Sequence, residues 1–425
     1  MALVLMMLPA TVQAWSEDIL SHFQVYITAE EEYNSNIDAA PNRFKKDDFI
    51  TTISPGLRFS TRQFRRPPTE EGRFQLDLNF QTGFVFYAKE HEHNDNYISL
   101  NGSLNARYAL TQNLTFRVGD SLTRSDDIRE ADYSATAPPG QFLLSRLNER
   151  EPYYRNVFSP SVEYRFGREN MIALNYRNNI YDIKSRTVED SMENYISPSL
   201  TYWISVRHGV SLSYGLTLGD FEDSPDYLGH MATGRYTYRF NPRASIFCEY
   251  TYLTRDFDPP SIDYDVHRPT LGMEYKFSPT LTGTVQGGYF WQNPEEGSRT
   301  RGPSFNVSLT KTEARTTYIL SLNGGYTEDY FSAENRGFTK TYTANGTITH
   351  RLTEKLSVGA TGSIGRATFS NDQKDWIWTI SGNTSYALLR WLSLSLHGAY
   401  NGNHSNLSDL DYAQYRGMFR ITATY

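Results

Sequence analysis

Arginines recur at alternating positions in segments of this chain that are otherwise rich in aromatic and aliphatic residues. In "YRFNPRASIFCEY" (238–250), Arg239 lies between two aromatic residues, and Glu249 follows beyond an Asn-Pro pair. A guanidinium group forms bidentate hydrogen bonds to carboxylates, so arginines gathered on one face could bind acidic groups. Whether they gather depends on the elements that position them.

Strict alternation of apolar and polar residues dominates from about Ser21 to Tyr425. "RFQLDLNFQ" (73–81) places phenylalanine and leucine on one face and glutamine, aspartate and asparagine on the other, and "VSLSYGLTLG" (210–219) alternates in the same way. A period of two predicts β-strands, because successive side chains of a strand point to opposite faces.

Short turns separate these runs at intervals of roughly 40 residues, and longer polar segments lie between the turns. Each repeat therefore predicts a strand, a long loop, a strand and a short turn. A propeller blade has a similar period, but these runs are longer than blade strands and match tilted transmembrane strands instead. The predicted short turns are 110–113, 167–170, 206–209, 241–243, 278–280, 312–315, 352–355 and 389–391.

The composition combines high polarity with abundant aromatic residues. Only 39% of residues are hydrophobic, yet 14% are aromatic, and the 31 tyrosines outnumber the 29 glycines. A membrane barrel explains this combination, since its outer face is apolar, aromatics ring both interfaces and the lumen is polar. Aromatics in an ordinary sandwich are the alternative. We therefore predict an all-β fold: a single transmembrane antiparallel up-and-down β-barrel of about twenty strands, or eighteen, with short periplasmic turns and long acidic extracellular loops.

The amino-terminal stretch "MALVLMMLPATVQAWSED" predicts an export signal. A short apolar run is followed by Val12 and Ala14, which fit a small-x-small cleavage site. The predicted organisation is a signal peptide at 1–14 and an outer-membrane barrel at 15–425. No segment approaches 18 apolar residues, so no helical anchor is expected. The single cysteine, Cys248, excludes an intramolecular disulfide.

Two segments resemble known bacterial proteins. Residues 29–59, "AEEEYNSNIDAAPNRFKKDDFITTISPGLRF", resemble the first hairpin of the putative beta-barrel porin type 2 family. The final run "YRGMFRITATY" (415–425), with its terminal aromatic, resembles the sorting signal of outer-membrane barrels. These resemblances imply a location in the bacterial outer membrane, contact with its lipid and lipopolysaccharide, and a link to exopolysaccharide gene clusters and their secretion machinery. They bring no catalytic residues and leave the oligomeric state open.

The more polar face of the predicted strands carries more basic than acidic residues. Its acids are Asp77, Glu163, Glu249 and Glu274. The predicted pore-lining basic residues are Arg58, Arg107, Arg117, Arg165, Arg177, Arg235, Arg239, Arg268, Arg416 and Arg420, with Lys276 beside them. A basic lumen would attract anionic solutes, such as an acidic polysaccharide. Alternatively, the arginines pair with lumen acids and rigidify the wall.

The leading functional prediction is a passive outer-membrane channel or export pore for an anionic or polysaccharide solute. A structural barrel that binds surface polymer without conducting is one alternative, and a barrel-based hydrolase is another. The chain contains no GxSxG, HExxH or phosphate-binding motif, so we predict neither an enzyme nor a cofactor. The basic residues accompany no nucleic-acid-binding motif, and no such partner is expected.

Three loop features suggest further chemistry. His91 and His93 lack a visible third ligand, so no metal site is predicted there. Acidic loops such as 220–226 and 256–265 could bridge Ca²⁺ or Mg²⁺ to lipopolysaccharide, or serve only for solvation. The longest loop, 125–154, could fold inward to narrow the pore, or remain external.

Overall fold

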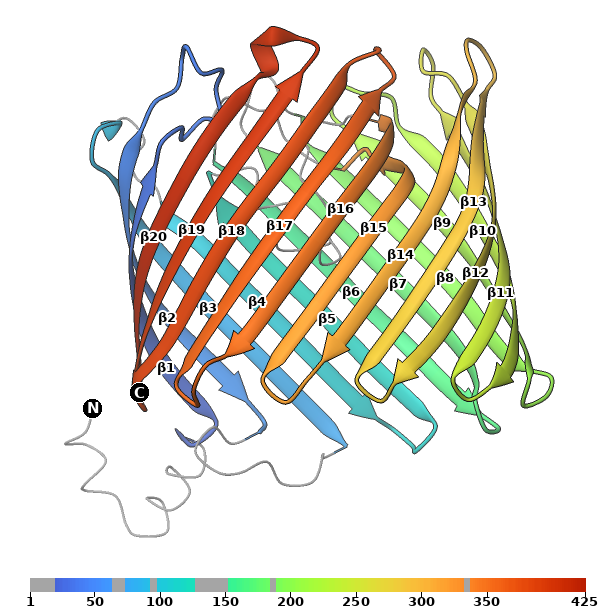
Figure 1. The fold of residues 1–425 in the computed structure, drawn as a ribbon, viewed down its shortest axis with the longest axis horizontal. Helices are drawn as coiled ribbons and strands as arrows, with labels where there is room; N and C mark the ends of the chain where they lie inside the picture. Colours follow the sequence, from blue (N-terminus) through green and yellow to red (C-terminus); the bar gives the residue numbers. More distant parts are fainter. Residues whose placement is uncertain (1–19, 63–72, 92–97, 127–151, 184–188, 332–336) are drawn as a thin grey trace.

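The chain forms a closed barrel of antiparallel strands (Figure 1). The computed structural model describes residues 20–62, 73–91, 98–126, 152–183, 189–331 and 337–425. Each strand pairs with the next along the chain, and β1 also pairs with β20, which closes the sheet. The described strands are β1 Phe23–Asn34, β2 Asp48–Ser60, β3 Phe74–Tyr87, β4 Ile98–Ala109, β5 Leu114–Ser125, β6 Tyr153–Phe166, β7 Asn170–Ile183, β8 Ser191–Trp203, β9 His208–Phe221, β10 Tyr227–Asn241, β11 Ala244–Phe257, β12 Tyr264–Ser278, β13 Leu281–Pro294, β14 Thr300–Thr312, β15 Thr316–Asp329, β16 Gly337–Arg351, β17 Leu356–Phe369, β18 Lys374–Leu389, β19 Leu392–Ser405 and β20 Tyr412–Thr424.

The predicted architecture is confirmed, with twenty strands among the described residues rather than eighteen. The turn predicted at 241–243 joins β10 to β11, and its flanking residues Asn241 and Ala244 face each other across the pair. Figure 1 shows the short connections together at one end of the barrel, where the carboxyl terminus also lies. The described residues include the 3₁₀ turn η2 (Ser408–Leu410), and no helix among them has the length and apolarity needed to cross a bilayer.

Apolar side chains cover the outside of the wall and polar side chains cover the inside, which is the reverse of a soluble protein. On β3, Phe74 and Phe80 are about half exposed on the outside, whereas Gln75 between them is buried on the inside. This follows from the alternation, because one face of each strand meets lipid and the other meets the lumen. The apolar surroundings of the barrel are therefore the bilayer itself, and the polar residues lie within.

Several hairpins are closed by an aspartate side chain at the end of the barrel where the long loops lie. Each accepts a hydrogen bond from a backbone N–H at the end of the preceding strand: Asp190 from Ile183 (2.7 Å), Asp226 from Phe221 (2.9 Å), Asp263 from Phe257 (2.7 Å) and Asp411 from Ser405 (2.6 Å). These acids therefore have a structural role as hairpin caps. Within the described segments, no group of three or more His, Cys, Asp and Glu side chains is arranged to hold a metal ion.

Several predictions lie outside the described residues. These are the signal peptide at 1–14, His93, and nearly all of the loop between Ser125 and Tyr154 that was expected to narrow the pore.

Candidate functional site

The predicted basic residues all lie on the inward face of the wall. Arg58 is opposite Gln24 on one side and Asn79 on the other, while its neighbour Leu57 is exposed on the outer face. Residues that pair across neighbouring strands point to the same side of the wall. Arg107 and Arg117 are such a pair, so both point inward. Their role in lining a conducting pore stays a prediction.

Most of these arginines are held by carboxylates. The ion pairs are Arg117–Glu163 (2.9 Å), Arg165–Glu163 (2.5 Å), Arg177–Glu193 (2.5 Å), Arg235–Glu274 (2.5 Å), Arg239–Glu169 (3.0 Å), Arg416–Glu32 (2.8 Å) and Arg420–Glu30 (2.5 Å). Among the other three, Arg58 bonds Asn79 and Gln24, and Arg268 bonds Thr251. Much of the basic face therefore fits the alternative in which the arginines pair with acidic residues of the lumen.

The sequence tally underestimated the acids that face these arginines. Glu30, Glu32 and Glu193 occupy inward positions of β1 and β8, and Glu169 lies in the short turn before β7. The expected excess of positive charge is correspondingly smaller. Alternation could have identified Glu30 and Glu32, since the intervening Glu31 is exposed on the outer face. Glu169 could not be assigned this way because it lies between strands.

Aromatic rings fix several of the same guanidinium groups. Arg239 lies 3.9 Å from the ring centre of Trp203, and Arg235 lies 3.5 Å from that of Phe247. Arg58 stacks on Tyr26 at 4.4 Å. Cation–π contacts of this kind restrict the rotation of long side chains and leave the charge at a defined place. The inner wall thus carries charges in fixed positions.

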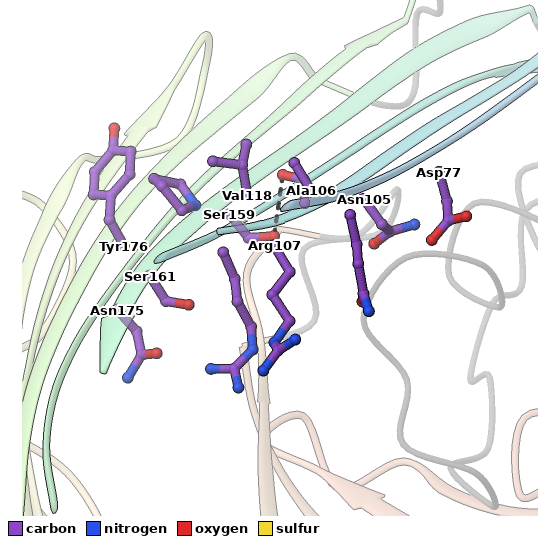
Figure 2. A pocket seen from close by; sticks show the side chains of 13 residues that line it. Asp77, Asn105, Ala106, Arg107, Val118, Ser159, Ser161, Asn175 and Tyr176 are labelled. Atoms are coloured by element: carbon purple, nitrogen blue, oxygen red, sulfur yellow. Dashed lines mark hydrogen bonds between the residues drawn. The ribbon is translucent and has the colours of Figure 1, made fainter. Parts of the chain in front are cut away.

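One groove in the wall combines two adjacent arginines with uncharged polar groups and one carboxylate, that of Asp77 (Figure 2). Arg107 and Arg117 are cross-strand partners on β4 and β5, and both line a cavity of about 430 Å³. The other polar side chains around it include Gln75, Asp77, Asn105, Ser159, Ser161 and Asn175. Like charges directly opposite on a sheet repel each other, so an anion between them would be stabilised by both.

Near the long-loop end, β15 separates from β14 and turns into the lumen, while β16 stays paired with β17 as far as Thr339. Pairing between β14 and β15 ends at Phe305 and Gly324, although both strands continue beyond this point. Gly325 has a φ of +151°, which residues with side chains rarely adopt. In Figure 1 the ends of β15 and β16 stop short of the neighbouring hairpin tips. We call residues 325–331 and 337–338 the lumen hairpin.

Aromatic side chains pack the lumen hairpin against the inside of β9–β13. Phe331 stacks on Phe221 with ring centres 5.3 Å apart, and Tyr330 lies 5.2 Å from Tyr227. Phe338 belongs to a buried cluster with Leu253, Tyr264, Val266 and Phe290. This interior cluster shows that the hairpin covers the inner face of the adjacent wall.

A buried ion pair lies beside these rings. Arg255 donates to Glu328 at 2.8 Å, and Tyr264 donates to the other oxygen of Glu328 at 2.6 Å. The hydroxyls of Tyr264 and Tyr330 are 2.8 Å apart. Sequence reasoning classified this segment as a polar loop and missed its role. The available signal was Gly324-Gly325 followed by four aromatic residues among the hydrophilic ones.

Comparison with protein families identifies the barrel. Residues 217–425, from within β9 to the carboxyl terminus, match the family model described as "Putative beta-barrel porin 2". This part of the chain is similar to that family. The match lies beyond residues 29–59, so it supports the resemblance from a different part of the chain. The protein is a barrel of the bacterial outer membrane.

Solved structures of other outer-membrane proteins resemble this chain in overall shape. OpdK from Pseudomonas aeruginosa is 11% identical, with 95% of this chain and 99% of that chain covered and a TM-score of 0.44. OccAB4 from Acinetobacter baumannii is 12% identical, with coverage of 95% and 98% and a TM-score of 0.44. The siderophore receptor PirA from Acinetobacter baumannii is 7% identical, with coverage of 94% and 80% and a TM-score of 0.48. No curated protein sequence matches the chain significantly.

Proposed function

We propose that this barrel is a passive outer-membrane pore for an anionic solute, and specifically for an acidic polysaccharide. The observation that carries the proposal is the placement of Arg107 opposite Arg117 in a polar groove of the inner wall. A carboxylate of the solute can accept hydrogen bonds from both guanidinium groups, with Arg117 using the donors that its ion pair with Glu163 leaves.

The groove also suits the neutral part of a sugar chain. Asn105, Asn175, Ser159 and Ser161 offer amides and hydroxyls around the two arginines. Sugar hydroxyls both donate and accept hydrogen bonds, and these side chains can do the same. The family resemblance, with its link to exopolysaccharide gene clusters, favours a polysaccharide over a small anion. The motifs of a nucleotide-driven pump are missing from the sequence, so transport would follow the concentration gradient.

Planar-bilayer recordings of the purified protein test the charge preference. We expect the pore to favour anions, and the double substitution Arg107→Gln/Arg117→Gln to lower the anion-to-cation permeability ratio by at least about twofold. Lys311→Gln/Arg315→Gln is the matched control, because it also removes two positive charges, near the β14–β15 turn and outside the groove. A clear cation preference of the unmodified protein would reject the anion pore.

A second candidate function is a structural barrel that binds surface polymer without conducting. The lumen hairpin favours it, because its contacts with Tyr227 and Phe221 occupy part of the interior. A protein that inserts into bilayers and stays folded, yet shows no conductance with any salt or oligosaccharide, would select this function. A measurable conductance would select the pore.

A further inference from the structure

The outer wall over β5–β8 carries polar side chains where apolar ones are expected. Asp120, Asn156, Tyr176, Asn178 and Asn194 occupy outward positions of these strands, in register with exposed residues such as Phe158 and Ile196. Asn156 donates to Asp120 at 2.8 Å. The Tyr176 hydroxyl and the Asn178 amide both donate to Asn194, at 2.7 and 3.0 Å. We call these five residues the outer polar patch.

The outer polar patch begins near the middle of the membrane. On β5, Asp120 lies between Phe116, which pairs with Tyr108 near the short turn, and Arg124, which pairs with Tyr154 near the long-loop end. With a rise of about 3.3 Å per residue and a tilt of about 40°, each of these levels is about 10 Å from Asp120. An ionisable group at this depth is unfavourable against lipid and indicates a functional contact.

Because of the pairing between β5, β6, β7 and β8, residues of the outer polar patch lie nearly symmetrically on the two sides of a line parallel to the barrel axis. With strands about 4.8 Å apart and the same tilt, Asp120 and Tyr176 lie at the same depth to within about 2 Å, and about 12 Å apart. Asn156 and Asn194 form a second such couple, nearer the long-loop end. The line midway between Asp120 and Tyr176 is also midway between Asn156 and Asn194. It passes between Phe158 and Asn178, which are cross-strand partners.

We propose that the outer polar patch is the contact surface between two copies of this chain, related by a two-fold axis along the membrane normal. Such an axis at the midline brings Asp120 of one copy to Tyr176 of the second, and Asn156 to Asn194. In this contact the Tyr176 hydroxyl donates its single proton to the carboxylate of Asp120 instead of to Asn194, and the Asn194 amide donates to the Asn156 side-chain oxygen. A two-fold contact is isologous, so each hydrogen bond is made twice.

A second copy fits this surface better than an unrelated partner because the patch is complementary to itself. The wall is also flat enough for two copies to touch over this area. A barrel of twenty strands has a radius of about 20 Å, so its surface recedes by only about 1 Å at 6 Å to either side of the two-fold axis. Polar side chains can therefore meet across the contact. In the apolar bilayer, such hydrogen bonds and close packing drive association.

Disulfide crosslinking in native outer membranes tests the proposal. The background is Cys248→Ser, because Cys248 is exposed. Phe158→Cys lies beside the predicted axis and should give a crosslinked dimer on mild oxidation. Leu396→Cys, an exposed outward position on β19, is the matched control and should stay monomeric. Equal crosslinking at both positions, or none at Phe158→Cys, would overturn the proposal.

Two further measurements separate a lost contact from a lost fold. Asp120→Leu/Asn156→Leu should reduce the Phe158→Cys dimer about tenfold, while Thr384→Leu on the opposite wall should leave it unchanged. Heat-dependent gel mobility reports whether each variant still forms the barrel. Native mass measurement from lipid nanodiscs should show two copies. A monomer that carries lipopolysaccharide, or a complex with a different protein, would assign the patch to that partner and reject the second copy.

Discussion

Tyr264 of the barrel wall donates a 2.6 Å hydrogen bond to Glu328 of the lumen hairpin. The same carboxylate accepts from Arg255, and both members of this ion pair are largely buried. A buried carboxylate with two charge-assisted or hydroxyl donors is fully satisfied, so the hairpin is held by polar groups as well as by aromatic packing.

Removal of Glu328 should release the lumen hairpin. Glu328→Ala leaves the buried Arg255 charge unpaired, which costs about 3–5 kcal/mol of docking free energy. If the barrel conducts, we expect a larger or noisier single-channel current, measured in planar bilayers. Glu313→Ala, at the short turn after β14, is the control and should leave the current unchanged. An unaltered current for Glu328→Ala in a folded barrel would mean that the hairpin does not limit conduction.

Glu169 should titrate below the usual range. It lies in the short turn before β7, and the hydrogen bond from Arg239 lowers the pKa of its carboxyl group. The lowered value means that the pair stabilises the fold above the ordinary glutamate pKa of about 4.3, and that this stability is lost as the pH falls through the lower value. Because the pair is solvent-exposed, its worth is only a few tenths of a kcal/mol.

Carboxyl NMR of labelled protein measures this titration directly. Arg239→Gln should return the pKa of Glu169 towards its ordinary value, whereas Arg235→Gln, four residues away on the same face, should not. If Glu169 titrates normally in the unmodified protein, its contact with Arg239 does not persist in solution.

The closure of the barrel should depend on the arginines of β20. Arg416 donates two hydrogen bonds to Glu32 of β1, at 3.1 and 2.8 Å, and Glu32 is buried. Arg416→Met leaves that carboxylate without its ion-pair partner, so we expect a loss of about 3 kcal/mol in unfolding free energy. Urea unfolding in lipid vesicles measures the loss. Adding Glu32→Met should recover most of it, and failure to recover would show that the pair acts through something other than charge.

The capping aspartates should work without calcium. Asp226 and Asp263 each accept a backbone N–H bond at a hairpin end, so Asp226→Ala and Asp263→Ala should each cost about 1 kcal/mol. Millimolar Ca²⁺ should not shift the thermal unfolding of the unmodified protein. A marked stabilisation by Ca²⁺ that Asp226→Ala abolishes would instead assign these acids to cation binding.

The strands and their two faces are determined by the sequence alone. Alternation with a period of two is a local property, and runs such as 73–81 display it without reference to the rest of the chain. Short turns at regular intervals then give antiparallel neighbours, and the exclusion of water from the bilayer requires the sheet to close. The inward orientation of the predicted arginines follows from the same pattern.

The partners of those side chains are decided only by the tertiary structure. Arg239 meets Glu169, which lies 70 residues earlier, because the tilt of the strands brings the end of β10 close to the turn before β7. No local pattern encodes that tilt. The lumen hairpin depends likewise on contacts across the interior, where Glu328 reaches Arg255 and Tyr264 on strands that are not its neighbours in the sheet. Alternation specifies which face a residue occupies, but only the closed, tilted barrel specifies which residues meet.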